Sequence, residues 1–361
     1  MKPKRRLLLI ASAISLVLAG LALLFSPPHL QLYNVTVLPM SAWDVAINDR
    51  GQVVGVAGST RKPHLLLWDR HNGMKDLGPI YLANPDINNA GQIAGTTKDA
   101  NGNEQAFFWD PKEGRRLLGT LGGSRSAALA LNNHGQVVGY SNSSDGQRQP
   151  FIWDKASGMR SLAAHGRQSG EARAINDAGQ AIGSIATGLG DATPSWSACY
   201  WDSTDPLTTP IVAGLSRDDY PPSGFDINNN GYVLARKRRR PRRRGWFCLW
   251  RKDAELKWLG SFDYVDLIAF NDANQVLHSA HHDRLLERLS RKYFPSYTAW
   301  WLWDPKRGRI QLDSQIPSSV GKLYGVIDIN NHGCIVGMIR APDRRRELNV
   351  LLDPIPERWG R

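Results

Sequence analysis

One short phrase occurs seven times along the chain: an apolar residue, Asn, then Asn or Asp, any residue and Gly, followed one residue later by an apolar pair. Successive copies end 40, 44, 44, 52, 43 and 59 residues apart, which is the period of a repeat architecture rather than of an ordinary globular domain. The copies are Ile47–Gly51, Ile87–Gly91, Leu131–Gly135, Ile175–Gly179, Ile227–Gly231, Phe270–Asn274 and Ile329–Gly333.

Each phrase predicts a β-hairpin turn. A three-residue hairpin ends in a left-handed residue, a conformation that Gly adopts without steric cost and Asn tolerates next best. Asn274 stands at this position in the sixth copy and fits the same rule. The preceding Asn or Asp side chain can accept hydrogen bonds from nearby main-chain amides.

An aromatic-rich run that ends in Trp and Asp follows most of the phrases, and a further Pro- or Gly-containing turn comes after it. Each unit therefore contains four short runs of β type. Units of about forty to fifty residues that occur four to eight times are typical of a β-propeller, although a solenoid competes. The Trp residues are interpreted as blade-to-blade core. The runs are Leu65–Asp69, Phe107–Asp110, Phe151–Asp154, Cys199–Asp202 and Trp301–Asp304.

The seventh unit lacks a fourth strand, because the chain is nearly finished after its third, near Leu348–Asp353. Gln31–Leu38 precedes the first phrase at the spacing of an orphan final strand. The sequence therefore predicts an all-β fold: a seven-bladed β-propeller of four-stranded blades over residues 31–353, closed by the N-terminal strand and followed by a tail at 354–361. Closure removes the open sheet edges that invite aggregation.

The units resemble the HAF repeat family of extracellular repeats, whose consensus runs Ala, two variable residues, Ile, Asn, two variable residues, Gly, one variable residue, Val, Val and Gly. The segment Thr120–Ser124 is similar to the family's linking phrase, and the naming tripeptide is degenerate at Gln105–Phe107 and Gln149–Phe151. The resemblance covers nearly all of residues 31–353 and implies a location outside the cytoplasm. It implies no catalytic residues. The Trp-Asp propeller repeats are the alternative, but their Gly-His element is absent.

Residues 7–25 are apolar or small, carry no charge and follow a basic leader at residues 1–6. At 1.5 Å per residue such a helix would be about 28 Å long, enough to cross the hydrocarbon core. The sequence predicts a retained signal anchor with a short linker at 26–30, and a cleaved signal peptide is the alternative. The basic leader predicts a cytoplasmic N-terminus and a periplasmic or extracellular propeller.

The net charge of +12 is local, since the leader contributes four positive charges and one run after the fifth phrase contributes eight. The run lies between the second and third strands of unit five, and unit seven carries Arg residues in the same slot. We expect a basic arc on one face of the ring that points away from the membrane, although a solvated loop tip explains such a run equally well. The candidate anion-binding residues are Arg236, Lys237, Arg238, Arg239, Arg240, Arg242, Arg243, Arg244, Arg344, Arg345 and Arg346.

A short amphipathic helix is expected at 281–294, where Leu285, Leu286, Leu289 and Phe294 have helical spacing. Anionic polymers and acidic proteins are the expected partners of the basic arc. The predicted compartment argues against nucleic acid, although phosphate contacts ask only for clustered charge.

No motif in the sequence indicates a metal site, a cofactor or a catalytic residue, and three Cys do not supply a disulfide framework. The sequence therefore favours a binding or scaffolding module. A hydrolase or lyase with a site in the central funnel is the alternative, because propeller sites assemble from different blades. An acidic or His cluster in the funnel would favour catalysis.

Overall fold

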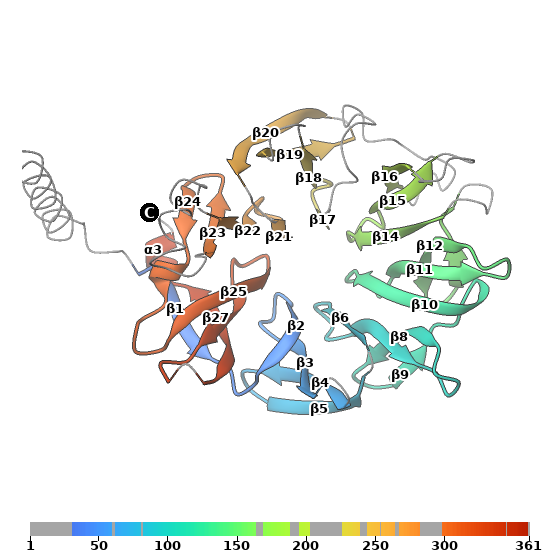
Figure 1. Ribbon diagram of the computed structural model, residues 1–361, viewed down its shortest axis with the longest axis horizontal. Coiled ribbons are helices and arrows are strands. Elements are labelled where there is room, and N and C mark those ends of the chain that lie inside the picture. Colours follow the sequence, from blue (N-terminus) through green and yellow to red (C-terminus); the bar gives the residue numbers. More distant parts are fainter. Residues whose placement is uncertain are drawn as a thin grey trace, which may run out of the picture.

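Seven β-sheets stand around a central channel (Figure 1). In blades one to six the strands follow chain order from the channel outward, whereas in blade seven the N-terminal strand of the chain is outermost; neighbouring strands pair antiparallel. The architecture is the predicted all-β propeller of seven four-stranded blades, with three strands of blade four inside the described residues. The structure, a computed structural model, describes residues 31–59, 62–80, 82–163, 169–187, 195–202, 226–238, 244–252, 254–263, 267–281, 298–343 and 345–359.

Blades one to three are the most regular part of the ring, and each contains four strands. Blade one contains β2 (Ala42–Ile47), β3 (Val53–Ser59), β4 (Lys62–Asp69) and β5 (Gly73–Pro79). Blade two contains β6 (Leu82–Ile87), β7 (Ile93–Lys98), β8 (Glu104–Asp110) and β9 (Gly114–Leu117). Blade three contains β10 (Gly122–Leu131), β11 (Val137–Ser143), β12 (Arg148–Asp154) and β13 (Gly158–Ser161).

Blades four to seven complete the ring. Blade four contains β14 (Gly170–Ile175), β15 (Ala181–Thr187) and β16 (Ser195–Trp201). Blade five contains β17 (Asp226–Ile227), β18 (Val233–Arg238), β19 (Arg244–Arg251) and β20 (Ala254–Asp263). Blade six contains β21 (Leu267–Phe270), β22 (Val276–His281), β23 (Thr298–Asp304) and β24 (Gly308–Gln311). Blade seven contains β25 (Lys322–Ile329), β26 (Ile335–Arg340), β27 (Glu347–Pro354) and β1 (Tyr33–Val37).

The N-terminal strand closes the ring, as predicted. β1 pairs antiparallel with β27, with Tyr33 opposite Pro354 and Val37 opposite Val350. The fully buried Asn349 of β27 then fastens blade seven to blade one, because its Oδ1 accepts from the Ala42 amide at 2.7 Å and its Nδ2 donates to the Ala42 oxygen at 3.1 Å. The two ends of the propeller are therefore joined both by a strand and by a buried amide side chain.

The segment predicted as a C-terminal tail contains a short helix, α3 (Pro356–Trp359), packed against the closing strand. The Trp359 indole donates to the Leu32 oxygen at 2.9 Å, and its ring meets the Tyr33 ring edge-on at 5.4 Å. The 3₁₀ helix η2 (Asp313–Gln315), which follows blade six, contacts the residue before the closing strand, because Gln315 Oε1 accepts from the Leu32 amide at 2.6 Å. Both elements fix the start of the closing strand.

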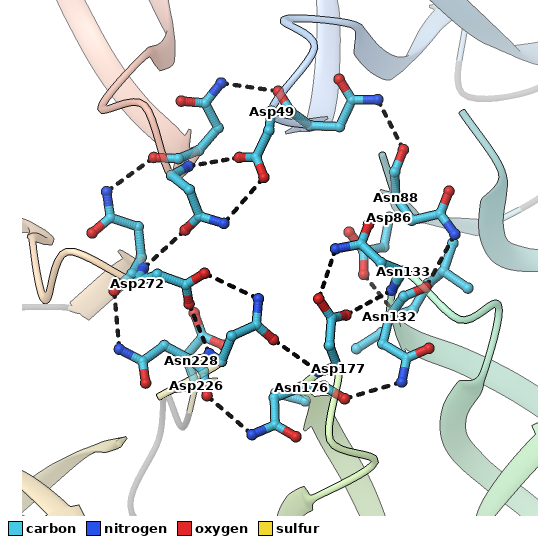
Figure 2. Close-up of a pocket in the computed structure, with 18 of the residues that line it drawn as sticks. Asp49, Asp86, Asn88, Asn132, Asn133, Asn176, Asp177, Asp226, Asn228 and Asp272 are labelled. Carbon is cyan, nitrogen blue, oxygen red and sulfur yellow. Dashed lines mark hydrogen bonds between the residues drawn. The ribbon is translucent and has the colours of Figure 1, made fainter. Parts of the chain in front are cut away.

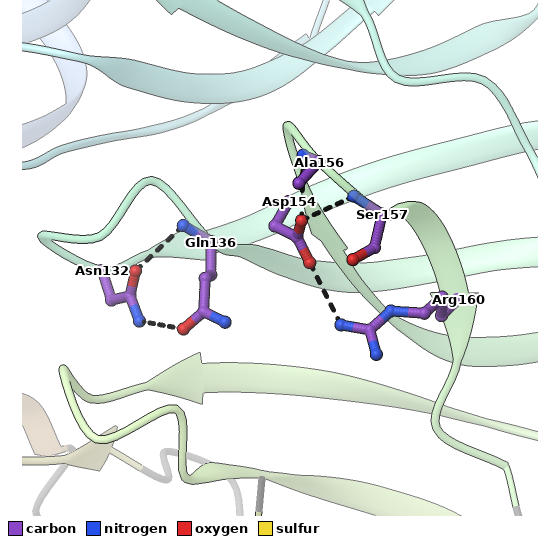
Figure 3. Close-up of polar contacts among 6 residues, drawn as sticks. All are labelled: Asn132, Gln136, Asp154, Ala156, Ser157 and Arg160. Atoms are coloured by element: carbon purple, nitrogen blue, oxygen red, sulfur yellow. Dashed lines mark hydrogen bonds and ion pairs between the residues drawn. The ribbon is translucent and has the colours of Figure 1, made fainter.

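The turn phrases form hairpins with the predicted chemistry, as blade three illustrates (Figure 3). Asn132 Oδ1 accepts from the Gln136 amide at 2.9 Å, and Gly135 is left-handed with φ 74°. Asn274 is also left-handed, with φ 59°, so Asn takes the place of Gly there as expected. The later turn of the same blade is held by Asp154, whose Oδ1 accepts from two main-chain amides. These turns lie together on one face, called here the turn face.

The core consists of seven apolar clusters, each between two neighbouring blades. Trp68 of blade one, for example, packs with Val336 and Leu351 of blade seven. This confirms that the repeated Trp residues are blade-to-blade core, and each such burial stabilises the fold by about 1.5–3 kcal/mol. The equivalent Trp residues of blades one to five are 2–9% exposed: Trp68, Trp109, Trp153, Trp201 and Trp250.

Three predicted features lie partly or wholly outside the described residues. They are the anchor at 7–25, the helix at 281–294 and the central part of the basic run at 239–243. Among the residues that the structure does describe, no helix is long and apolar enough to span a membrane.

Candidate functional site at the centre of the ring

The first Asn of every turn phrase takes part in a closed ring of hydrogen bonds around the channel (Figure 2). Its side chain is 3–4% exposed, and its Nδ2 donates to the main-chain oxygen of the equivalent Asn in the next blade at 2.8–3.2 Å. Every blade thus gives one bond and receives one, which couples all seven. The residues are Asn48, Asn88, Asn132, Asn176, Asn228, Asn271 and Asn330.

The residue after this Asn forms a second closed ring. Its main-chain amide donates to Oδ1 of the equivalent residue in the next blade at 2.7–2.9 Å. No two of its three Asp are neighbours, and each carboxylate accepts from an adjacent Asn side chain at 2.8–3.1 Å. Like charges are therefore kept apart. The residues in order are Asp49, Asn89, Asn133, Asp177, Asn229, Asp272 and Asn331.

Three further carboxyl groups line the channel: Asp86, Asp226 and Asp328, each two residues before a ring Asn. Each accepts from the amide of the residue that follows it and from an amide of the next blade. Asp86, for instance, accepts from Leu131 of blade three at 2.7 Å. The other blades have Ala at this position where the structure describes it, so the carboxyls act as clamps between particular pairs of blades.

The channel carboxyls hold protons more tightly than ordinary Asp side chains. Burial raises the pKa of Asp226 to about 7 and that of Asp328 to about 8, and repulsion from Asp86 adds to both shifts. Burial also raises the pKa of Asp86. The amide hydrogen bonds act in the opposite direction but are outweighed. Near neutral pH Asp226 and Asp328 therefore retain protons, at least in part, that free Asp side chains have lost.

The channel widens into a funnel of about 440 Å³ on the side away from the turn face. Asp44 and Asn84, which lie at equivalent positions of blades one and two, line this funnel and have φ of 49° and 75°. They are two of the three non-Gly residues with positive φ in the described part of the chain. The funnel is lined by Asp44, Val45, Ala46, Asn84, Pro85, Asp86, Leu129, Arg173, Ile268, Ile327 and Asp328.

Arg173 is the cation of the funnel wall. It pairs with the buried Glu171, which also pairs with Arg148. The Arg148 guanidinium lies over the Tyr140 ring at 3.5 Å from its centroid, which fixes it in place. Among the described residues, one carboxylate serves two guanidinium groups, which leaves this cluster with a net positive charge beside the funnel.

The predicted basic residues fall on the funnel side where the structure describes their backbone. Arg236–Arg238 end β18 and Arg244 begins β19, so the run joins the second and third strands of blade five, as predicted. Arg345 and Arg346 are exposed in the corresponding turn between β26 and β27 of blade seven. Residues 239–243 and 344 lie outside the described part, so the structure describes only portions of this predicted site, in two blades that blade six separates.

The described residues contain no group of three His, Cys, Asp or Glu side chains arranged to hold a metal ion. The three Cys are free thiols, with Cys199 and Cys248 buried among core residues. The titratable groups gathered at the channel are therefore the Asp carboxyls and Arg173.

The sequence contains a signal for the channel carboxyls, because the tripeptide Asp-Ile-Asn occurs at 86–88, 226–228 and 328–330. The turn phrase includes the Asn of this tripeptide but not the Asp, so the phrase alone does not indicate the carboxyls. Arg173 could not be recognised as a funnel residue, since no other unit has an Arg at the equivalent position. Likewise, turn chemistry accounted for the Asn residues without showing that their amides reach the next blade.

No protein-family profile matches the sequence, and no curated protein matches it either. Solved structures match in fold at low identity. A puromycin hydrolase superposes with a TM-score of 0.57 at 13% identity, over 88% of this chain and 52% of the other. An oligogalacturonate lyase in complex with manganese gives 0.55 at 8% identity, over 91% of this chain and all of the other.

The tricorn protease superposes with a TM-score of 0.54 at 9% identity, over 92% of this chain and 35% of the other. This chain therefore spans about a third to a half of the length of the hydrolases and peptidases that it matches. At these identities the likeness shows a shared propeller fold.

Proposed function

We propose that the protein is a binding module anchored to a membrane by its N-terminal segment, with the propeller outside the cytoplasm and an anionic partner bound on the funnel side. The observation that carries this proposal is the position of the basic residues. Arg236–Arg238 and Arg244 flank, and Arg345 and Arg346 belong to, the turns between second and third strands, which lie on one face of the ring.

Ion pairing within these turns leaves part of the charge available to a partner. Arg346 pairs with Asp343 at 3.0 Å and Arg340 pairs with Glu347 at 3.0 Å. Arg345 is exposed, and no described acidic side chain pairs with its guanidinium. An anionic polymer or an acidic protein surface would therefore meet the exposed Arg345 guanidinium on the funnel side, and long-range attraction would speed the encounter.

The direction of the closing strand supports the proposed orientation. Tyr33 at the start of β1 pairs with Pro354, which ends β27 at the turn face. Residue 31 therefore enters the ring on the side opposite the basic turns. If residues 7–25 are a retained anchor, the turn face lies toward the membrane and the funnel faces outward.

The test is binding of the full-length chain to heparin at low salt. Each basic side chain near an anionic surface contributes about 1 kcal/mol, so replacing three should weaken binding roughly a hundredfold. The variant is Arg236→Gln with Arg238→Gln and Arg345→Gln. Its matched control removes three exposed cations elsewhere, at Arg50, Arg116 and Arg160. Equal loss in both variants would show that only net charge matters and would contradict the proposal.

A hydrolase or lyase with its site in the funnel is the second candidate. The observation in its favour is the group of buried carboxyls with raised pKa values at Asp86, Asp226 and Asp328, since perturbed acids gather at catalytic sites. The similar structures include a hydrolase, a protease and a lyase, but the likeness is of fold alone. Both oxygens of Asp86 and of Asp328 accept main-chain amides, which favours the clamp role. Turnover that Asp328→Asn abolishes would favour the enzyme.

A further inference from the structure

The funnel carries opposite charges on opposite walls. Asp44, Asp86 and Asp328 come from blades one, two and seven, whereas Arg173 comes from blade four. In a ring of seven blades, blade four lies across the channel from the junction of blades seven and one (Figure 1). The carboxyls therefore line one side of the funnel, and the guanidinium stands on the other.

Apolar side chains from five of the blades form a band around the funnel wall. Val45, Pro85, Leu129, Ile268 and Ile327 each stand three residues before the ring Asn of their blade, so they lie at one level of the funnel. Arg173 occupies this same position in blade four. The level therefore consists of an apolar band interrupted by a single cation.

The acidic side of the funnel should attract a ligand cation, and the side that carries Arg173 should attract a ligand anion. In their charged forms the carboxyls of Asp86 and Asp328 are desolvated and repel each other, so a ligand cation between them would relieve both costs and favour their ionisation. Arg173 shares the Glu171 carboxylate with Arg148, so a ligand anion would balance the remaining positive charge. Asp44 and Asn84 hold strained backbones at this wall, a feature that clusters at ligand-binding sites.

We propose that the funnel binds a small zwitterion of dipeptide size, with its ammonium group between Asp86 and Asp328, its carboxylate toward Arg173 and its apolar side chains on the band at Val45, Pro85, Leu129, Ile268 and Ile327. This site is separate from the basic turns at the rim. A funnel of about 440 Å³ has room for such a molecule together with water.

The first experiment uses the natural full-length chain, so that it does not depend on the folding of a variant. Titration calorimetry compares dileucine with free termini, N-acetyl-dileucine and dileucine amide. Dileucine should bind at least tenfold more tightly than either blocked form, because each block removes one charge. No binding of dileucine, or equal binding of all three peptides, would overturn the proposal. Equal binding of dileucine and its amide would show an amine site alone and would overturn it too.

Proton release provides a second readout. An ammonium group favours the charged carboxylates, so binding at pH 7.5 should release protons, seen as a dependence of the binding heat on the ionisation heat of the buffer. Asp328→Asn should weaken dileucine binding at least tenfold, reduce this release and leave binding of the N-acetylated form unchanged. The matched control, Asp76→Asn, changes an exposed carboxyl on an outer strand and should behave like the natural chain.

The carboxylate half of the site is tested by Arg173→Gln, with Arg160→Gln as its control. Arg173→Gln should abolish the preference for dileucine over dileucine amide, whereas Arg160→Gln should preserve it. A preference retained in Arg173→Gln would overturn the assignment of the cation. Removal of Arg236, Arg238 and Arg345 should leave dileucine binding unchanged, so failure of this proposal can be told apart from failure of heparin binding.

Discussion

The two ends of the central channel are built from the same strands, yet they differ in how strictly the sequence repeats. At the turn face, seven Asn side chains occupy one position and close one ring of hydrogen bonds. A few residues earlier, at the funnel, the equivalent positions hold Val45, Pro85, Leu129 and Arg173 among others. The repeated end holds the blades together, and the varied end provides different chemistry on each wall.

Cooperation among the blades explains why the turn end tolerates so little variation. Each ring Asn satisfies groups in its own turn and in the next blade, so one change leaves several buried polar groups unpaired. At the funnel, a substitution changes one wall and leaves the others in place. The comparison therefore predicts large stability effects at the turn face and mainly binding effects at the funnel.

The largest effect is expected for Asn132→Ala. The side chain is buried, with Nδ2 donating to the Asn176 oxygen at 3.0 Å and Oδ1 accepting from the Gln136 amide at 2.9 Å. Loss of these bonds should lower the free energy of unfolding by about 3 kcal/mol, measured by urea denaturation. Asn133→Ala, in the more exposed second ring, should cost about 1 kcal/mol. Equal costs would break the distinction between the rings.

The next effect is the pH dependence of stability that arises from two channel carboxyls, Asp226 and Asp328. The folded pKa values of Asp226 and Asp328, about 7 and about 8, exceed the ordinary value of 3.8, so the folded state binds protons more tightly than the unfolded state. Their stabilising contribution is full at low pH and is lost as pH rises toward 8. The free energy of unfolding should fall by about 2 kcal/mol between pH 6.5 and 8.5.

Replacement of both residues by Asn should flatten this dependence, because the amide oxygen still accepts but does not titrate. The window starts at pH 6.5 because of His278, whose pKa burial lowers to about 4. Below pH 6.5 this group makes the free energy of unfolding rise with pH, which opposes the trend of the carboxyls. A slope unchanged in the double variant would show that the channel carboxyls do not control the pH dependence.

A smaller effect is expected where the ring closes. Trp359→Ala removes the indole bond to Leu32 and the edge contact with Tyr33, which should destabilise the fold by about 1.5 kcal/mol. Met74→Ala is the control, since Met74 is 48% exposed on an outer strand and should change little. Thermal unfolding is the measurement. An unchanged melting temperature in Trp359→Ala would show that α3 contributes nothing to closure.

The smallest effect is expected at the left-handed Asn274. Asn274→Gly relieves the positive φ but loses the bond that Oδ1 accepts from Asn228 at 3.1 Å, so the net change should stay within about 0.5 kcal/mol. Asn274→Ala keeps the strain, loses the bond and should cost about 1 kcal/mol more than Gly. Equal stability of the two variants would mean that the φ of 59° carries no cost.

Much of the fold could be predicted because local chemistry repeats along the chain. The left-handed Gly residues, the Trp core and the orphan strand before Leu38 each give a signal in sequence order. The rings of Asn and Asp could not be predicted, since their bonds join residues 40 to 59 positions apart, or 282 where the ring closes. The opposition of Arg173 to Asp328 likewise depends on the count of blades between them.

The most direct test of the contrast between the two ends is hydrogen exchange of the full-length chain with and without heparin. Slower exchange is predicted in peptides that contain the turns between β18 and β19 and between β26 and β27, with no change in those that contain Asn48, Asn132 or Asn330. Protection confined to the turn face, or protection nowhere, would contradict the account.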